Sequence, residues 1–186
     1  MLTIREIRAL AGNLKLDRFA RELGPFALIQ RPPGLAAGGA TNVMGLPLNA
    51  RATQIARPDR LTGDVLSLLF EFETLIVATL PPLEGTDLLT VGRAADCDVL
   101  LDDPSVSKRH ATLRWSEAKR TCTLEDRRST NGTFLNGSIR IRKAVILRDG
   151  DIISFGEVPF WYLLTPTLYD RLTDGKPATK TGMRLR

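Results

Sequence analysis

Three short polar segments carry most of the side chains in this sequence that could hold a phosphate. They are Gly92-Arg93, Ser107-Lys108-Arg109-His110 and Ser129-Thr130-Asn131-Gly132. A guanidinium binds phosphate through parallel hydrogen bonds, and hydroxyl and ammonium groups add further donors. An asparagine amide both donates and accepts, which suits it to the main chain of a peptide. These residue types indicate recognition of a phosphorylated peptide, provided that the fold brings the three segments together.

The same residues are poor material for catalysis. Ser107 and His110, the only histidine, lie in one short segment without an obvious third group or oxyanion element. The two cysteines, Cys97 and Cys122, form no CxxC pair, and the sequence has no P-loop. We therefore expect no enzyme activity, no metal site and no cofactor, and we interpret His110 as a structural residue.

The net charge of +5 conceals an uneven distribution along the chain. Residues 67–104 carry 1 basic and 8 acidic side chains, whereas residues 105–148 carry 11 basic and 3 acidic ones. Such a basic stretch predicts an anionic partner, which could be a phosphate, an acidic peptide or a nucleic acid. A solvated basic surface without a partner is the alternative.

Length and composition are those of a globular protein. The chain has 186 residues, of which 43% are hydrophobic and 25% charged. No apolar run approaches the roughly 18 residues that a membrane span needs. Charged side chains interrupt the beginning of the chain, so the apolar core of a signal peptide is missing. We expect an intracellular, cytoplasmic protein without a membrane partner.

Four zones follow one another along the chain. Residues 1–24 are predicted to be a helical segment, in which Thr3 and Glu6 have capping-box spacing. Residues 25–66 are rich in Pro and Gly and are predicted to be a linker. Residues 67–166 hold short apolar runs separated by turn signals, which is typical of an all-β sandwich. Residues 167–186 are predicted to be a C-terminal tail with one helical turn.

The candidate strands within residues 67–166 are short. They are Phe70–Thr74, Leu88–Val91, Asp98–Leu101, Ala111–Trp115, Thr121–Glu125, Thr133–Leu135, Ile139–Leu147, Ile152–Phe155 and Pro159–Leu164. The dipeptides Asn131-Gly132, Asn136-Gly137 and Asp149-Gly150 are strong turn signals between them.

The order and spacing of the polar segments resemble those of a forkhead-associated (FHA) domain. The matching pieces are Gly92-Arg93, Ser107-x-x-His110, Ser129–Gly137 and Leu147–Gly156. They span about residues 67–166, and the segment before residue 67 lies outside the match. The resemblance implies a β-sandwich of about eleven strands with an N-terminal helical extension and linker. It also implies that loops at one end of the sandwich bind phosphothreonine peptides.

The resemblance assigns roles to individual residues. Arg93 and Ser107 resemble the phosphate ligands of the family, and Lys108 resembles an additional phosphate contact. Asn131 resembles the residue that hydrogen-bonds the peptide main chain, and Thr130 contributes to the same pocket. The remaining matched residues resemble structural support: the glycine permits the turn of its loop and the histidine braces the binding loop. This supporting group is Gly92, His110 and Gly132.

Arg127 and Arg128 depart from the small or apolar pair that many members of the family carry here. They follow Asp126 directly and precede Ser129. Two arginines beside the pocket could favour acidic residues near the phosphothreonine. Exposed charges of little energetic value are the alternative.

The function that we expect is phosphothreonine recognition by an adaptor or scaffold downstream of a Ser/Thr kinase. The helices at the N-terminus could pack on the sandwich or dock a second protein. One alternative is an interaction module that binds its partner without phosphate and tolerates loss of Arg93 or Ser107. A nucleic-acid binder using the basic surface ranks behind both, because only 6% of residues are aromatic and no reading helix is recognisable.

The linker itself contains candidate ligands, Thr41, Thr53 and Thr62. The resemblance implies that the termini of the domain lie at the end opposite the binding loops, so the linker must cross roughly 35–40 Å. Measured back from Ser67, an extended chain reaches about 17 Å at Thr62, about 46 Å at Thr53 and about 85 Å at Thr41. On this basis a phosphorylated self-ligand is expected to be Thr41 or Thr53 and not Thr62. A linker that serves only as a passive spacer is the alternative.

Overall fold

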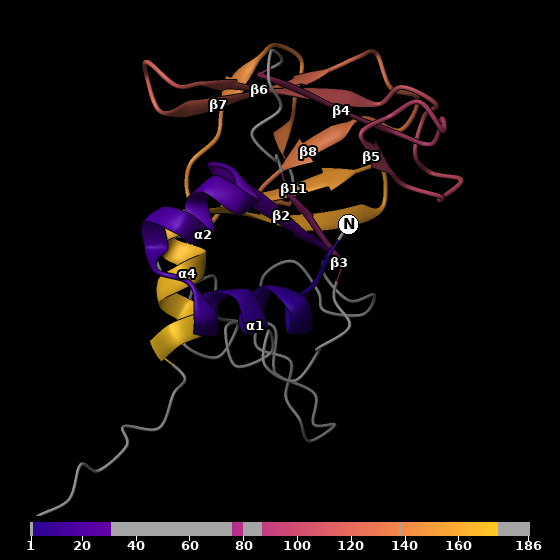
Figure 1. The fold of residues 1–186 in the computed structure, drawn as a ribbon. Helices are drawn as coiled ribbons and strands as arrows, with labels where there is room; N and C mark the ends of the chain where they lie inside the picture. Colours follow the sequence, from indigo (N-terminus) through magenta and orange to yellow (C-terminus); the bar gives the residue numbers. More distant parts are fainter. Residues whose placement is uncertain (1, 31–75, 80–86, 138, 175–186) are drawn as a thin grey trace, which may run out of the picture.

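The computed structural model describes residues 2–30, 76–79, 87–137 and 139–174, and all structural statements refer to these residues. Two β-sheets stack face to face, and helices cover the outer face of the larger sheet (Figure 1). The all-β sandwich with N-terminal helices that the sequence predicts is therefore confirmed. Among the described helices, none is long and apolar enough to span a bilayer.

The larger sheet has seven strands in the order β1-β3-β2-β12-β11-β8-β9. They are β1 (Leu2–Thr3), β2 (Phe26–Gln30), β3 (Ile76–Thr79), β8 (Thr133–Leu135), β9 (Ile139–Arg140), β11 (Ile152–Phe155) and β12 (Val158–Leu164). The smaller sheet has five strands in the order β10-β7-β6-β4-β5. They are β4 (Leu88–Gly92), β5 (Val99–Leu100), β6 (Ala111–Ser116), β7 (Thr121–Asp126) and β10 (Val145–Ile146).

Most predicted strands of the sandwich have a counterpart in the structure. Thr133–Leu135 and Ile152–Phe155 have the bounds that we expected. The expected strand Ile139–Leu147 divides into β9, in the larger sheet, and β10, in the smaller one. The expected strand Phe70–Thr74 lies outside the described residues.

Strand β2 corrects the predicted linker, which was expected to begin at residue 25. Phe26–Gln30 instead pairs with β12 and with β3 near the middle of the larger sheet. Phe26 and Leu28 face the smaller sheet, whereas Ala27 and Ile29 face the helices. A strand buried on both faces is apolar throughout and shows no alternation, so its five residues lacked the sequence pattern of a strand.

The direction of β2 also corrects the assumed start of the linker. Gln30 pairs with Phe160, which lies close to the β11–β12 turn at Gly156. The amide of Gly156 donates to the carbonyl oxygen of Gly132 at 3.0 Å, so this turn touches the predicted binding loops. Because β3 is antiparallel to β2, Ile76 begins at the same end. Gln30 and Ile76, the described residues on either side of residues 31–75, thus both lie at the binding-loop end.

Three helices of the described residues form the third layer. They are α1 (Ile4–Asn13), α2 (Leu16–Leu23) and α4 (Thr165–Asp174). The predicted capping box of α1 is confirmed, because Thr3 N donates to Glu6 Oε2 at 2.7 Å and Glu6 N to Thr3 Oγ1 at 3.3 Å. The apolar faces of the helices bury a second core against the outer face of the sheet. The N-terminal helices therefore pack on the sandwich.

Helix α4 corrects the predicted C-terminal tail in its first part. Leu168 and Leu172 are buried in the second core. The Tyr169 hydroxyl donates to the carbonyl oxygen of Leu14, at the end of α1, at 2.9 Å. Residues 167–174 are thus an integral helix, whereas residues 175–186 lie outside the described part of the chain.

Candidate functional site

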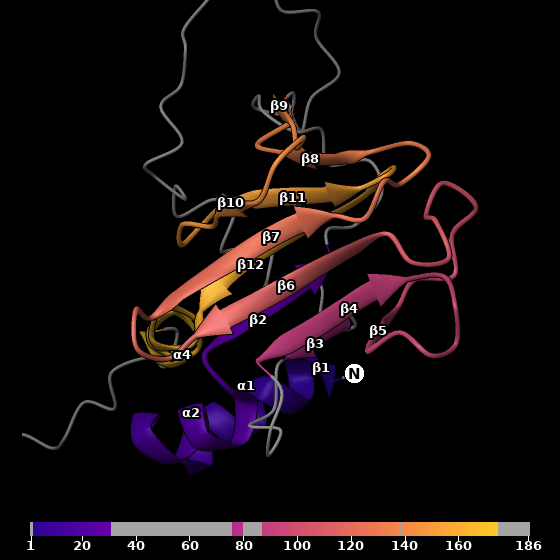
Figure 2. The same cartoon turned by 90° about the horizontal axis from the view of Figure 1, so that it is seen from above.

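The three polar segments meet at one end of the sandwich. Seen from above, β4 and β7 run toward the same side, where their loops lie (Figure 2). The amide of Arg93 donates to the carbonyl oxygen of Ser107 at 3.0 Å. The amide of Thr130 donates to the hydroxyl oxygen of Ser107 at 3.0 Å. Ser107 therefore joins the loop after β4 to the loop between β7 and β8.

Ser107 has a hydroxyl that is held but remains partly exposed. It accepts from Thr130 N and donates to Thr130 Oγ1 at a longer distance of 3.4 Å. The short bond fixes the oxygen, whereas the long one is weak and its hydrogen is easily redirected. A phosphate oxygen beside Thr130 would find both hydroxyls as donors.

Arg93 and Lys108 supply the positive charge beside this hydroxyl. The Arg93 Nε donates to the carbonyl oxygen of Val106, the residue before Ser107, at 3.3 Å. This contact brings the guanidinium to the Ser107 loop and leaves its terminal N–H groups without a partner among the described residues. Both Arg93 and Lys108 are exposed, so their charges are available to a ligand.

Gly92 is required for space, and this corrects the reason that the resemblance suggested. Its φ is not in the left-handed region. A Cβ at Gly92 would lie 2.2 Å from the carbonyl oxygen of Lys108 and 2.9 Å from the sulfur of Cys97. The close approach allows Ala94 N to donate to that same carbonyl at 3.0 Å. Gly92 thereby lets two loops pack backbone against backbone.

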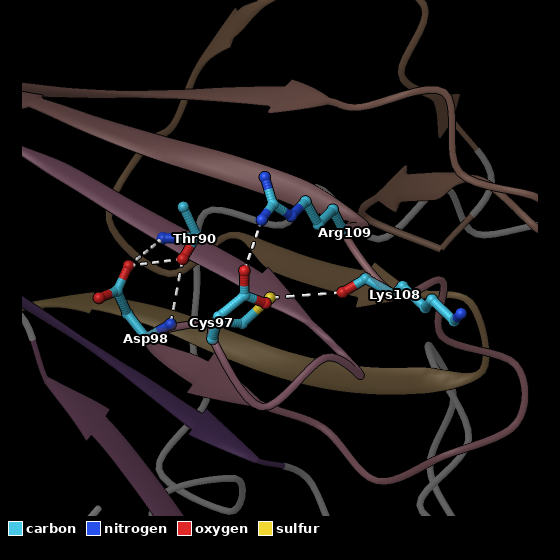
Figure 3. Close-up of polar contacts among 6 residues, drawn as sticks. Thr90, Cys97, Asp98, Lys108 and Arg109 are labelled. Carbon is cyan, nitrogen blue, oxygen red and sulfur yellow. Dashed lines mark hydrogen bonds and ion pairs between the residues drawn. The ribbon is translucent and has the colours of Figure 1, made fainter.

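Polar contacts fix the loop after β4 (Figure 3). The Asp98 carboxylate accepts from the amide and the hydroxyl of Thr90 at 2.7 and 2.6 Å. The Cys97 sulfur donates to the carbonyl oxygen of Lys108 at 3.3 Å, and Arg109 forms an ion pair with Asp96. Since Arg109 is paired with Asp96, Lys108 is the cation of the segment Ser107–His110 that remains for a ligand.

His110 braces two binding loops from within the core. It is fully buried, and its Nδ1 accepts from Ser107 N at 3.0 Å while its Nε2 lies 3.1 Å from the carbonyl oxygen of Gly132. This arrangement needs the neutral ring with its proton on Nε2. Burial lowers the pKa of His110, and the contact with Gly132 opposes that effect only in part.

Asn131 stands at the exposed edge of the same loop. Its amide Nδ2 donates to the carbonyl oxygen of Ser105 at 2.8 Å. The Ser105 hydroxyl accepts from Glu157 N at 3.0 Å, so the β11–β12 turn supports this contact. The side-chain oxygen of Asn131, Oδ1, has no hydrogen-bond partner in the described part of the chain. It is available to accept from the main chain of a bound peptide.

Asp126 is an organising residue to which our sequence analysis gave no role. Its carboxylate accepts from Ser129 N at 3.0 Å, from Ser129 Oγ and from Thr133 Oγ1 at 2.7 Å. Burial acts to raise the pKa of Asp126, but the hydrogen bonds from Ser129 and Thr133 outweigh it and lower the pKa. The Asp-x-x-Ser spacing, typical of a carboxylate that closes a turn, is the signal that could have revealed it.

The two arginines after Asp126 differ in their surroundings. Arg127 forms an exposed ion pair with Glu125 at 3.3 Å, and its amide donates to the carbonyl oxygen of His110 at 2.8 Å. Arg128 is exposed, has a φ of 60°, and forms no ion pair with any described residue. Of the two arginines, Arg128 therefore has the charge that is more available to a ligand.

Arg140 is a second neighbour of the site that sequence reasoning missed. A Cβ built on Gly132, whose φ is +90°, would lie 2.6 Å from Arg140 Nε. The guanidinium thus rests against Gly132, next to Asn131. No sequence signal points to this contact, because it depends on the pairing of β8 with β9.

The site as a whole is a set of donors and cations around one hydroxyl. Among the described residues, no cluster of ligating side chains suits a metal ion. The arrangement provides charge-assisted hydrogen bonds to an anion and an amide for a neighbouring main chain.

Comparison with known proteins gives a family match over the same residues. Residues 89–156 match the model of the FHA domain. Curated relatives include an ABC transporter ATP-binding/permease protein of Mycobacterium tuberculosis, 33% identical over 127 residues, which are 68% of this chain and 12% of that protein. The oxoglutarate dehydrogenase inhibitor of Corynebacterium glutamicum is 36% identical over 77 residues, which are 41% of this chain and 51% of that protein.

Among solved structures, the chain is similar to EmbR of Mycobacterium tuberculosis in complex with a low-affinity phosphopeptide. The identity is 30%, the TM-score is 0.42, and the match covers 48% of this chain and 22% of that one. The chain spans no more than about half the length of the curated relatives named above. The similarity is therefore that of one domain and not of whole proteins.

Proposed function

We propose that this chain, which contains an FHA domain over residues 89–156, is a phosphothreonine-recognition module. Arg93, Ser107 and Lys108 hold the phosphoryl group, with Thr130 beside them. Asn131 grips the peptide main chain. Gly92, His110 and Gly132 keep the loops in position and make no contact with the ligand.

One observation supports this proposal above the others: Ser107 is bonded to both neighbouring loops. Its carbonyl accepts from Arg93 N and its hydroxyl oxygen from Thr130 N, each at 3.0 Å. A doubly charged phosphoryl group at this point would receive hydroxyl, guanidinium and ammonium donors from residues far apart in the sequence. Charge-assisted hydrogen bonds contribute roughly 1.5–3 kcal/mol each, so loss of Arg93 should weaken binding about thirtyfold.

Selectivity for threonine over serine depends on one methyl group. Burying a methyl group stabilises a complex by about 0.8 kcal/mol, which corresponds to roughly fourfold in affinity. A larger preference for phosphothreonine would require a closely fitting methyl pocket beside Ser107 and Thr130.

In the cell, the module would act downstream of a Ser/Thr kinase, as an adaptor or scaffold in the cytoplasm. It would bring a threonine-phosphorylated protein to whatever the rest of the chain binds. The relatives include a DNA damage response protein kinase of Saccharomyces cerevisiae, 36% identical over 80 residues. This likeness supports a place in kinase signalling but names neither the kinase nor the partner.

A matched peptide array tests the proposed function. Each peptide is made with phosphothreonine, phosphoserine or unmodified threonine, and binding is measured for the wild type and for Arg93→Ala. Arg114→Ala is the matched control, because Arg114 is an exposed arginine within β6. We expect phosphate-dependent binding that Arg93→Ala weakens about thirtyfold and Arg114→Ala leaves unchanged.

Two other outcomes would replace the proposal. Equal binding of phosphorylated and unmodified peptides, tolerant of Arg93→Ala and Ser107→Ala, would indicate a phosphate-independent interaction module. Binding of nucleic acid that falls steeply with salt and ignores Arg93→Ala would indicate the basic surface as a nucleic-acid site.

A ligand within the chain itself is a second part of the proposal. Thr41 and Thr53 lie outside the described residues, between the anchors Gln30 and Ile76. Because both anchors lie at the binding-loop end, chain length no longer excludes Thr62, which can lie up to about 46 Å from Ile76. A phosphothreonine tethered in this way would have an effective concentration of about 1 mM at the site. It would therefore compete with partner proteins for the site.

The self-ligand is tested by phosphorylating the full chain and titrating a free phosphothreonine peptide. We expect weaker apparent binding of the free peptide after phosphorylation, and recovery in the variant that lacks the modified threonine. Unchanged binding after complete phosphorylation of Thr41, Thr53 and Thr62 would reject this part of the proposal and leave the recognition site itself unaffected.

A further inference from the structure

Arg140 places a cation on the edge of the proposed peptide site. It lies in β9, where it pairs with Phe134, and its guanidinium rests against Gly132 in the loop that carries Asn131. The side chain is exposed. Within the described residues it has neither an ion pair nor a hydrogen bond, so nothing there neutralises its charge.

Further cations continue from Arg140 along the same side of the molecule. In the antiparallel pairing of β10 with β7, Val145 lies opposite Leu124. The residues just before β10 therefore run beside the end of β7, where the loop at residues 127–132 begins. Arg142 and Lys143 are exposed there. We call these residues the lateral basic surface: Arg128, Arg140, Arg142 and Lys143.

The four cations of the lateral basic surface outnumber the acidic residues near it, which are Glu125, Asp126 and the exposed Glu157, next to the Gly156 whose amide donates to Gly132. Asp126 is held by Ser129 and Thr133 on the inside of its loop. Glu125 forms an ion pair with Arg127, which is why Arg127 is not counted in the surface. The lateral basic surface therefore keeps a net positive potential that a ligand can use.

The opposite flank of the site has the opposite sign. The loops between β4 and Ser107 carry Asp96, Asp98, Asp102 and Asp103. Asp96 pairs with Arg109, so that cation offers little to a ligand. A peptide crossing the site would meet repulsion of its acidic residues on this flank and attraction on the flank of Arg140.

We propose that the lateral basic surface is a second anionic subsite, which binds an acidic group of the same peptide on one side only of the phosphothreonine. Arg140 is the specificity-determining residue, because its guanidinium rests against Gly132, the residue that follows Asn131. The acidic group is a carboxylate or a second phosphoryl group, since both present the oxygens that a guanidinium binds. This inference rests on the proposed function of the site.

The test measures Kd for a phosphothreonine peptide with uncharged flanks and for derivatives that carry one aspartate, or one further phosphothreonine, at each flanking position in turn. The proteins are the wild type, Arg140→Gln and the control Arg114→Gln, which replaces an exposed arginine of another strand. We expect tighter binding for acidic groups on one flank, about twofold to fivefold for a carboxylate and about tenfold for a second phosphoryl group.

Arg140→Gln should abolish that gain, whereas Arg114→Gln should keep it and both should bind the uncharged parent peptide like the wild type. A gain that persists in Arg140→Gln, a gain equal on both flanks, or no gain at all would overturn the inference. In each of those cases, retained binding of the parent peptide would leave the proposed function standing. Loss of parent-peptide binding by the wild type would reject the proposed function instead.

Discussion

At the residue scale, the geometry of the candidate site depends on groups to which the proposed function gives no contact with the ligand. Gly92 lets two loops approach, His110 joins two loops from inside, and Asp126 closes the turn that presents Thr130 and Asn131. Each of these residues fixes a backbone segment, and the backbone in turn fixes the side chains that bind. Substitution of a supporting residue should therefore reduce stability and affinity together.

Gly92→Ala is expected to damage both properties. The new methyl group would lie 2.2 Å from the carbonyl oxygen of Lys108, so the backbone must move. Overpacking of this kind costs about 1–3 kcal/mol. Urea unfolding should reveal the loss of stability, and titration with a phosphothreonine peptide should reveal weaker binding.

Gly12→Ala is the matched control for that experiment. Gly12 is exposed within α1, where alanine favours the helix by roughly 1 kcal/mol. Unchanged or higher stability is expected there. If Gly92→Ala were as stable and as active as Gly12→Ala, the close approach of the two loops would not matter to the site.

His110 should make stability depend on pH below neutrality. Burial lowers its pKa in the folded protein, whereas the unfolded chain titrates near about 6.5. Between these two values the unfolded chain binds more protons, so the free energy of unfolding falls as the pH drops below about 6.5 and is fully retained above it. Urea unfolding between neutral and mildly acidic pH measures this slope.

His110→Gln is the control for the pH dependence, because His110 is the only histidine. The free energy of unfolding of that variant should fall less over the same pH range. Asp126 does not interfere, since its lowered pKa places its own effect in more acidic solution. If the free energy of unfolding changed with pH in parallel for the wild type and His110→Gln, a buried, neutral His110 ring would be contradicted.

At the element scale, the sequence predicted the alternating strand β6 and missed the strand β2, which does not alternate. The half-buried strand β6 was found, because Ala111, Leu113 and Trp115 are buried while Arg114 is exposed. Strand β2 was missed, because its faces are covered by the smaller sheet and by the helices. Burial on the second face depends on α1, α2 and α4, and no local pattern in Phe26–Gln30 reveals that layer.

A chain that starts at residue 67 tests the importance of β2. It would lack the partner of β12 and would uncover Trp161 and Leu163, which are buried against the helices. We expect such a chain to be unfolded or aggregated, whereas residues 1–174 should unfold cooperatively. Circular dichroism and urea unfolding compare the two. Cooperative unfolding of the shorter chain with undiminished stability would contradict this account.

At the scale of the whole molecule, charge and topology act together. The three segments that meet at the candidate site were singled out from their residue types, their spacing and the resemblance, and their contacts agree with this. Arg140 could not be predicted, since its place beside Gly132 results from the register of β8 and β9. The direction of β2 was equally hidden, and it brings Gln30 and Ile76 to the binding-loop end.

The most direct test of the central claim is to follow backbone amide resonances during titration with a phosphothreonine peptide. The account predicts that the largest shifts fall on Arg93, on Ser107 to Arg109 and on Thr130 to Gly132, and that unmodified peptide causes none of them. Shifts concentrated on α1, α2 and α4, or identical for both peptides, would contradict it.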